Sequence, residues 1–308
     1  MSRIHEALKK AQEERAAQQD FRSTSVVEST ERPVSFPSAP TAVMDIPVPT
    51  SSLPVDHLAG PLTFDVLLAR CPQMRWNPDP SALVFINTDE NSEGKEVFRT
   101  LRTRLYQVRA VQPLKTVIIT SALPGEGKTF VTSNLAQSLI RQRERRVLLI
   151  DADLRVPNLH TPLGAPISPG LSDYLLGEVD EIGVLQRGRD ENLFLISGGK
   201  TVPNPNELLA NGRLERLLER LGPAFDWILM DSPPTIPVSD TSILAKMCDG
   251  LLMVVRAGST PFDLAQKACQ EFNDRPLLGA VLNRADKRAG YGGYYYQGYS
   301  TELQKGKS

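Results

Sequence analysis

The sequence predicts an α/β fold with a doubly wound, mostly parallel sheet, because two patterns recur along the chain. From about residue 81, short apolar runs alternate with helical stretches, and each run is continuously apolar rather than alternating with polar residues. Continuous runs are typical of strands that are buried on both faces, as in a parallel sheet covered by helices. Strand–helix alternation over about 200 residues predicts one such domain.

The positions of the elements follow from the same patterns. The expected strands are Leu83–Ile86, Thr116–Thr120, Val147–Ile150, Leu193–Ile196, Trp227–Met230, Leu251–Val255 and Leu277–Leu282. The expected helices lie near Glu93–Arg109, Lys128–Gln142, Asn206–Leu221, Ser239–Lys246 and Pro261–Asn273. Because such sheets bind ligands at the carboxyl ends of their strands, functional motifs are expected directly after the strands.

Composition places the chain among soluble, intracellular proteins. Its 35 basic and 36 acidic residues give a net charge of −1, which argues against a protein that coats nucleic acid. No apolar run approaches the roughly 18 residues that a membrane-spanning helix needs. Cys71, Cys248 and Cys269 are widely spaced, which excludes a disulfide framework and a cysteine-based zinc site.

The N-terminal part differs in composition from the rest. Residues 1–20 contain strong helix formers, with Ser2 placed to cap the first turn, and predict an amphipathic helix that is either solvated or a docking segment. Residues 21–80 are expected to form a flexible linker, because Pro, Ser and Thr dominate much of this segment. The predicted α/β domain then spans residues 81–286, and a flexible Tyr-rich tail is expected at residues 287–308.

The segment Ser121–Thr129, S-A-L-P-G-E-G-K-T, follows an expected strand and precedes a helical stretch. This is a P-loop of the relaxed form A-x4-G-K-T, and its context disfavours an ordinary Gly-rich turn. Gly125 and Gly127 let the backbone curl so that N–H groups point at phosphate oxygens. Lys128 is expected to reach the β and γ phosphates, and the Thr129 hydroxyl to bind magnesium. The expected nucleotide contacts are Gly125, Glu126, Gly127, Lys128, Thr129 and Phe130.

Two carboxylate motifs follow other apolar runs. V-L-L-I-D-A-D-L-R places Asp151 and Asp153 at one strand end, and W-I-L-M-D-S-P-P places Asp231 at another. Alternation along an extended chain predicts that Asp151 and Asp153 point to the same side. Each acid could lie in a surface loop. Three carboxylates that converge on a P-loop instead predict magnesium ligands, direct or through water, together with a base.

The order of these motifs resembles that of the bacterial tyrosine kinases (BY-kinases) of capsule and exopolysaccharide synthesis, the CpsD/CapB/Wzc type. The P-loop, D-x-D-x-R and D-x-P-P match the family's Walker A, Walker A′ and Walker B motifs. The related MinD/ParA ATPases carry an extra lysine in the P-loop, and Leu123 stands at that position here. The resemblance spans roughly Leu83 to Tyr299 and implies a P-loop NTPase of MinD/ParA-like fold, on the kinase branch.

A charged motif supports the resemblance. E-V-F-R-T-L-R places Glu96, Arg99 and Arg102 at helical spacing, and it matches the E-x2-R-x2-R motif that mediates ring-shaped self-association in the family. A solvated charged face is the alternative interpretation. The resemblance therefore implies a ring-like homo-oligomer.

The C-terminal segment Y-G-G-Y-Y-Y-Q-G-Y resembles the autophosphorylation tail of the family. Its interspersed glycines and polar end argue against a core strand. An aromatic sticky tail and a stacking strip for single-stranded nucleic acid are alternatives. The resemblance implies phosphoacceptors at Tyr291, Tyr294, Tyr295, Tyr296 and Tyr299.

V-L-N-R-A-D places Asn283 and Arg284 after the last expected strand. In related P-loop proteins this position contacts the adenine. An Asn amide can donate and accept hydrogen bonds at once, as base recognition requires.

The resemblance implies a kinase that uses ATP and Mg²⁺ to phosphorylate its own tail, mainly between subunits. Lys128 would hold phosphates, and Thr129, Asp153 and Asp231 would hold the metal. A phenol is a weak nucleophile at neutral pH, so a carboxylate beside it helps. Asp151 is the candidate base, with Asp153 as the alternative. A MinD/ParA-like ATPase switch at a membrane or on DNA is the competing function.

The resemblance also implies partners and a location. Many relatives are fused to a transmembrane activator, and this sequence has no apolar run that could span a membrane. We therefore expect a stand-alone cytoplasmic form that a separate membrane activator, of the polysaccharide co-polymerase type, recruits to the inner face of the membrane. A tyrosine phosphatase is an expected further partner, and nucleic acid is not.

Overall fold

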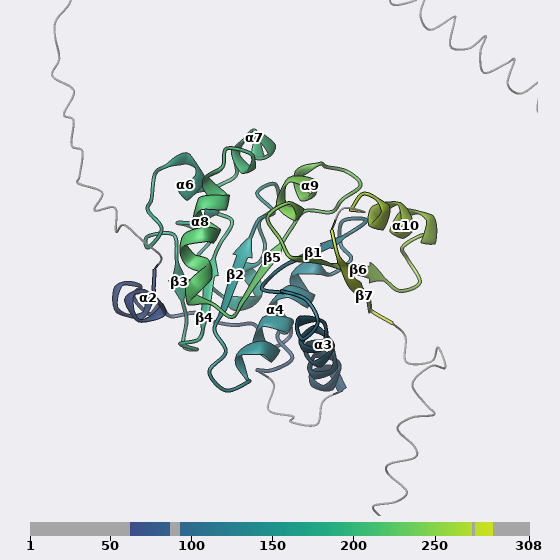
Figure 1. Cartoon of the computed structure of the whole chain (residues 1–308), viewed down its shortest axis with the longest axis horizontal. Helices are drawn as coiled ribbons and strands as arrows, with labels where there is room; N and C mark the ends of the chain where they lie inside the picture. Colours follow the sequence, from purple (N-terminus) through teal and green to yellow (C-terminus); the bar gives the residue numbers. More distant parts are fainter. Residues whose placement is uncertain (1–61, 87–92, 273–274, 286–308) are drawn as a thin grey trace, which may run out of the picture. The chain divides into compact units, whose positions relative to one another are not determined.

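The computed structural model describes residues 62–86, 93–272 and 275–285. The expected N-terminal helix, most of the expected linker and the tyrosine tail lie outside these residues. The described chain forms an α/β domain around one sheet (Figure 1). Among its helices, none is both long and apolar enough to cross a bilayer.

Seven strands form the sheet of the described residues, in the order β3-β4-β2-β5-β1-β6-β7. Every neighbouring pair is parallel except β3 and β4. The strands are β1 (Thr116–Ser121), β2 (Val147–Asp151), β3 (Gln186–Arg187), β4 (Leu193–Ile196), β5 (Trp227–Asp231), β6 (Gly250–Arg256) and β7 (Leu277–Asn283). The doubly wound, mostly parallel sheet predicted from the apolar runs is confirmed.

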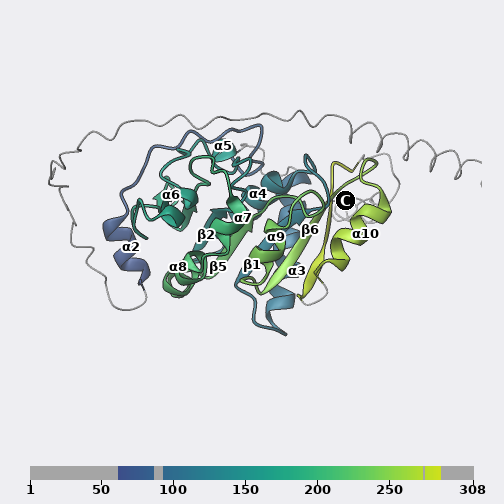
Figure 2. The same cartoon turned by 90° about the horizontal axis from the view of Figure 1, so that it is seen from above.

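Helices cover both faces of the sheet, with α3 and α4 on one side and α8, α9 and α10 on the other (Figures 1 and 2). The helices are α2 (Phe64–Arg70), α3 (Glu93–Arg109), α4 (Lys128–Ile140), α5 (His160–Leu163), α6 (Leu171–Leu176), α7 (Pro205–Leu209), α8 (Arg213–Leu221), α9 (Asp240–Ala245) and α10 (Phe262–Gln270), with a 3-10 turn at Gly222–Ala224.

Strands β1, β2, β4, β5 and β6 contribute alternate residues to two separate cores. In β1, Ile118 packs into the core beneath α8 and α9, whereas Val117 and Ile119 pack into the core beneath α3 and α4. Successive side chains of a strand point to opposite faces, so a strand covered on both faces must be apolar throughout. This is the reason why continuous apolar runs identified the strands.

The end of the expected linker is ordered, which corrects the boundary at residue 80. Thr63 caps α2, and Phe64 packs edge-on against Phe194 and Phe225. Leu67 is fully buried, and Gln73 pairs with β3. The polar composition that predicts a linker ends before these apolar residues, so residues 62–80 belong to the domain rather than to a linker.

Two further expectations are wrong in detail. Leu83–Ile86 forms turns rather than a strand, and Asn134 of α4 binds the backbone of Val84 and Ala82. A short apolar run shows burial without specifying the conformation. The expected helix Asn206–Leu221 is divided into α7 and α8, because Gly212 between them adopts a left-handed conformation with φ of 78°.

Candidate active site

The P-loop runs from the end of β1 to the start of α4, as the motif predicted. Gly125 and Gly127 have φ angles of 75° and 97°, which a residue with a side chain rarely adopts. A Cβ atom at Gly127 would also clash with the Asn283 side chain. Gly127 caps α4 without a side-chain hydrogen bond, so the first N–H groups of α4 have no side-chain cap. This arrangement is typical of phosphate-binding helix termini.

Sheet register brings the P-loop and the two carboxylate motifs together. Strands β2, β5 and β1 are neighbours, and Asp231 at the end of β5 pairs in register with both Asp151 and Ile119. The carboxyl ends of parallel strands meet at one edge of a sheet, which is where such folds bind ligands. The predicted convergence of the acidic motifs on the P-loop is therefore present.

Asp231 is held against the first turns of α4. Thr129 donates its hydroxyl hydrogen to Asp231 Oδ2 over 2.6 Å, and Thr132 donates to Oδ1 over 3.1 Å. The carboxylate is 2% exposed. Burial raises the pKa of Asp231 to about 6, although the two hydroxyl groups and Lys128 favour the charged form. A cation beside this carboxylate would restore its charge.

Asp151 has a different environment from Asp153, because β2 ends at Asp151 and strand alternation does not extend further. Asp151 is fully buried, and its Oδ2 accepts hydrogen bonds from the Asn158 and Leu159 amides, each over 2.9 Å. Burial and the neighbouring Asp231 raise its pKa well above the usual value. These contacts fold the loop that follows β2 around Asp151.

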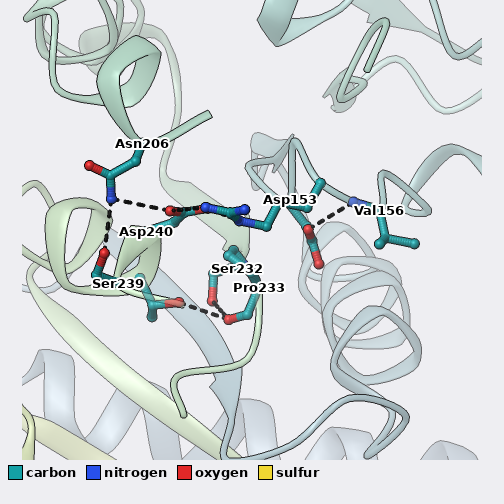
Figure 3. Close-up of polar contacts among 9 residues, drawn as sticks. Asp153, Val156, Asn206, Ser232, Pro233, Ser239 and Asp240 are labelled. Carbon is teal, nitrogen blue, oxygen red and sulfur yellow. Dashed lines mark hydrogen bonds and ion pairs between the residues drawn. The ribbon is translucent and has the colours of Figure 1, made fainter. Parts of the chain in front are cut away.

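Asp153 is only half-buried, and its Oδ1 accepts a hydrogen bond from the Val156 amide over 3.1 Å (Figure 3). Burial raises its pKa, while Lys128 lies close enough to lower it. Of the two acids in D-x-D-x-R, Asp153 is thus the one with access to solvent and to the charge of the P-loop lysine.

The oxygen atoms of Thr129, Asp153 and Asp231 suit a hard cation such as Mg²⁺. Within the described ranges, no group of three or more His, Cys, Asp or Glu is arranged to hold a metal by itself. Magnesium usually takes one or two protein ligands and completes its shell with water and substrate phosphates. The residues present fit that kind of shared site.

Glu126 of the P-loop is occupied by protein contacts. It is 2% exposed, and its Oε2 accepts a hydrogen bond from the Leu123 amide over 2.9 Å. Its Oε1 contacts the Thr260 hydroxyl group, beyond the end of β6. The side chain of this expected nucleotide contact therefore anchors the loop, and only its backbone is available for phosphate. Phe130 likewise packs its ring against Phe98.

Asn283 lies over the P-loop, close to where a nucleotide is expected. Its Nδ2 donates to the Glu126 carbonyl over 2.8 Å, and its Oδ1 accepts from the Arg284 amide over 2.9 Å. Arg284 is exposed, with a φ of 54°. The side-chain amide of Asn283 therefore binds the backbone of the P-loop. Its contact with the adenine stays a prediction.

The charged motif of α3 is divided between two environments. Arg99 and Glu96 form an ion pair of 3.2 Å with both side chains about half exposed. Arg102 instead donates to the Ser138 carbonyl of α4 over 2.6 Å. Glu96 and Arg99 are thus available on the surface, whereas Arg102 joins α3 to α4.

An ion pair that sequence reasoning missed lies beside the acidic motifs. Arg155 donates from Nε to Asp240 Oδ2 over 2.7 Å and from Nη2 to Oδ1 over 3.0 Å. Asn206 also donates to Asp240, and Figure 3 shows this group next to Asp153. The arginine of D-x-D-x-R was the available sequence signal, but nothing in the sequence indicated its partner.

The fold and site define a nucleotide-binding protein of known class. Residues 117–297 match the family described as the CobQ/CobB/MinD/ParA nucleotide binding domain, to which the chain belongs.

Within that class the chain is similar to tyrosine kinases. It is 35% identical to tyrosine-protein kinase YwqD of Bacillus subtilis over 226 residues, which cover 72% of this chain and 94% of YwqD. It is also 35% identical to tyrosine-protein kinase etk of Escherichia coli K12, over 67% of this chain but only 28% of etk. The chain belongs to the bacterial tyrosine-protein kinase family.

Solved structures agree with this assignment. The kinase domain of Escherichia coli tyrosine kinase ETK matches with a TM-score of 0.63 and 30% identity, over 75% of this chain and 90% of that one. The chimerical protein CapA2B2 matches with a TM-score of 0.64 and 27% identity, over 73% of this chain and 100% of that one.

Proposed function

We propose that the chain is an ATP- and Mg²⁺-dependent kinase that phosphorylates the C-terminal tyrosines of a neighbouring copy. The observation that carries the proposal is the 2.6 Å contact between Thr129 and Asp231, which joins the P-loop helix to the Walker B strand. Phosphoryl transfer depends mainly on positioning and charge neutralisation, and a hydroxyl and a carboxylate held together beside the P-loop support a role as ligands of a phosphate-bound cation.

Each group at the site has a proposed task. The P-loop amides and Lys128 bind the β and γ phosphates. Thr129, Asp153 and Asp231 would hold Mg²⁺, which when bound neutralises charge on the phosphate oxygens. Tyr291, Tyr294, Tyr295, Tyr296 and Tyr299 are the proposed phosphoacceptors, and they lie outside the described residues.

The acid that orients or deprotonates the phenol is one of the two in D-x-D-x-R. Asp151 remains a candidate because its raised pKa suits a proton acceptor. Its burial and its backbone hydrogen bonds favour a positioning task, whereas the half-buried Asp153 can be approached from solvent. A carboxylate that holds Mg²⁺ is a weak proton acceptor, however, so Asp151 stays the first candidate base and Asp153 the alternative. Asp153→Asn should abolish tyrosine labelling, and Asp151→Asn should reduce it while also lowering stability.

Labelled ATP tests the central proposal. Incubation of the full chain with Mg²⁺ should label tyrosine, and addition of a membrane activator fragment should increase the label. Lys128→Ala and a chain that ends before Tyr291 should both lose it, the first because phosphate is no longer held and the second because the acceptors are gone. Labelling that persists in both variants would contradict the proposal.

A second candidate function is an ATPase switch that positions a partner at a membrane or on DNA. The family match to the CobQ/CobB/MinD/ParA domain favours it, and Leu123 in place of the extra P-loop lysine speaks against it. ATP hydrolysis without any label on protein would favour the switch over the kinase.

The partners follow from the kinase proposal. We infer a ring-like homo-oligomer in which Glu96 and Arg99 lie at the interface and Arg102 supports their helix, a separate membrane activator of the co-polymerase type, and a tyrosine phosphatase that resets the tail. Control of capsule or exopolysaccharide export is the proposed cellular role. One relative, from Klebsiella pneumoniae, is named for a cps region.

A further inference from the structure

The ion pair between Arg155 and Asp240 is bidentate and therefore holds its two residues in a defined orientation. Two hydrogen bonds of 2.7 and 3.0 Å link two nitrogen atoms of the guanidinium to the two oxygen atoms of the carboxylate. Asp240 is 1% exposed, and Asn206 supplies a third donor to it over 3.2 Å. A bidentate guanidinium–carboxylate pair fixes orientation as well as distance, which a single lysine contact cannot do.

The two ends of this ion pair follow the two strands that end at acids of the site, β2 at Asp151 and β5 at Asp231. Arg155 lies two residues after Asp153 in the loop that follows β2. Asp240 is the first residue of α9, and residues 232–239 connect this helix to Asp231.

The residue next to Asp240 also contacts the segment that directly follows Asp231. Next to Asp240, Thr241 donates its hydroxyl hydrogen to the Pro233 carbonyl over 2.8 Å (Figure 3). Ser232 in turn donates to the Ile119 carbonyl of β1 over 3.1 Å. A continuous set of contacts thus runs from the Asp153 loop to the segment that follows Asp231.

We propose that Arg155 and Asp240 are positioning residues that hold the Asp153 loop and the Asp231 loop at the separation which a shared Mg²⁺–nucleotide requires. The inference rests on the proposed function, and it assigns the pair no contact with nucleotide or tyrosine. Because misplacement of a reacting group by about 1 Å can cost about a hundredfold in rate, the pair should affect turnover more than acceptor affinity.

The variants must separate positioning from folding. Removal of Arg155 leaves the buried Asp240 carboxylate without its ion-pair partner and can unfold the domain, whereas replacement of both residues by apolar ones is often tolerated. We therefore choose Arg155→Lys, which keeps the positive charge but cannot form the bidentate contact. The second choice is the double variant Arg155→Met/Asp240→Leu. Thermal unfolding of the full chain establishes that each variant is folded.

The chain offers a matched control. Arg145 forms an ion pair of 3.0 Å with Asp226, and its side chain is 42% exposed, compared with 40% for Arg155. That pair joins the beginnings of β2 and β5, whereas Arg155 and Asp240 join the loops beyond their ends. Arg145→Lys thus makes the same chemical change as Arg155→Lys. It does so at the opposite end of β2 and β5 from the acids.

Two measurements follow for each folded variant. Transfer of phosphate to an excess of full-length Lys128→Ala acceptor should show kcat lowered about tenfold or more and KM for the acceptor within about twofold. Binding of a fluorescent ribose-labelled ATP should need several-fold more Mg²⁺ for half-saturation. Arg145→Lys should match the wild type in both measurements.

The outcomes separate this inference from the proposed function. A folded double variant with wild-type turnover and wild-type Mg²⁺ requirement would overturn the positioning role. If the wild type labels no tyrosine, the kinase proposal fails, and the Mg²⁺ titration still decides the role of the pair. An equal shift in Arg145→Lys would show a general effect of replacing an ion-paired arginine by lysine, and it would also overturn the positioning role.

Discussion

At the residue scale, Asp231 is a buried carboxylate whose protonation should couple stability to pH. Its pKa in the folded chain is about 6, compared with about 3.9 in an unfolded one. Between these two values the folded state holds a proton that the unfolded state has lost. Stability of the nucleotide-free protein should therefore fall as pH rises from about 4 to about 6.

Asp231→Asn should remove part of this slope, and the part that remains belongs to Asp151 and Asp153, whose pKa values are raised as well. The measurement is the free energy of unfolding by urea across the interval. Asp79→Asn is a suitable control, because hydrogen bonds with Ser81 lower the pKa of Asp79. Its contribution to the pH dependence of stability therefore lies below about pH 4. An unchanged slope in Asp231→Asn would contradict the assignment.

The same residue shows what a sequence can predict. Asp231, Asp151 and the P-loop lie directly after buried strands, and parallel strands bring such positions to one edge. Motif and fold class together therefore predicted where the acids gather. The Arg155–Asp240 pair could not be predicted, because the partners are 85 residues apart and meet only through the path of the loop after β5.

At the element scale, α2 shows why composition alone predicts a domain boundary that is too late in the chain. The average composition of residues 21–80 is that of a polar linker. A few apolar residues near its end, however, decide whether this part of the chain packs on the domain. Phe64 contacts the rings of Phe194 and Phe225 at centroid distances of 5.7 and 6.2 Å, and Arg146 stacks on it at 4.2 Å. Helix α2 therefore belongs to the catalytic domain.

Phe64→Ala should lower the free energy of unfolding by about 3 to 5 kcal/mol, because it removes a buried ring from a packed aromatic cluster. Urea unfolding measures the effect, and nucleotide affinity of the folded protein should stay unchanged. Phe262 is 80% exposed, so Phe262→Ala is the matched control, with an expected change within about 0.5 kcal/mol. Equal effects of the two substitutions would place Phe64 outside the core.

At the scale of the whole molecule, phosphorylation should change the charge balance on which self-association depends. The unmodified chain has a net charge of −1, and each phosphotyrosine adds about −1.5 to −2 at neutral pH. Five modified tyrosines would repel one another and the acids of a neighbouring active site. We therefore expect a phosphorylated tail to leave the neighbouring subunit and the proposed ring to dissociate.

Light scattering after size-exclusion chromatography measures this directly, at low and at high salt. The phosphorylated full chain should have a lower mass than the unmodified chain at low salt, and the difference should shrink when salt screens the charges. Replacement of all five tail tyrosines by Phe should keep the assembly intact after incubation with ATP, since nothing can be phosphorylated there. Equal masses for the phosphorylated and unmodified chains at low salt would show that tail charge does not control assembly.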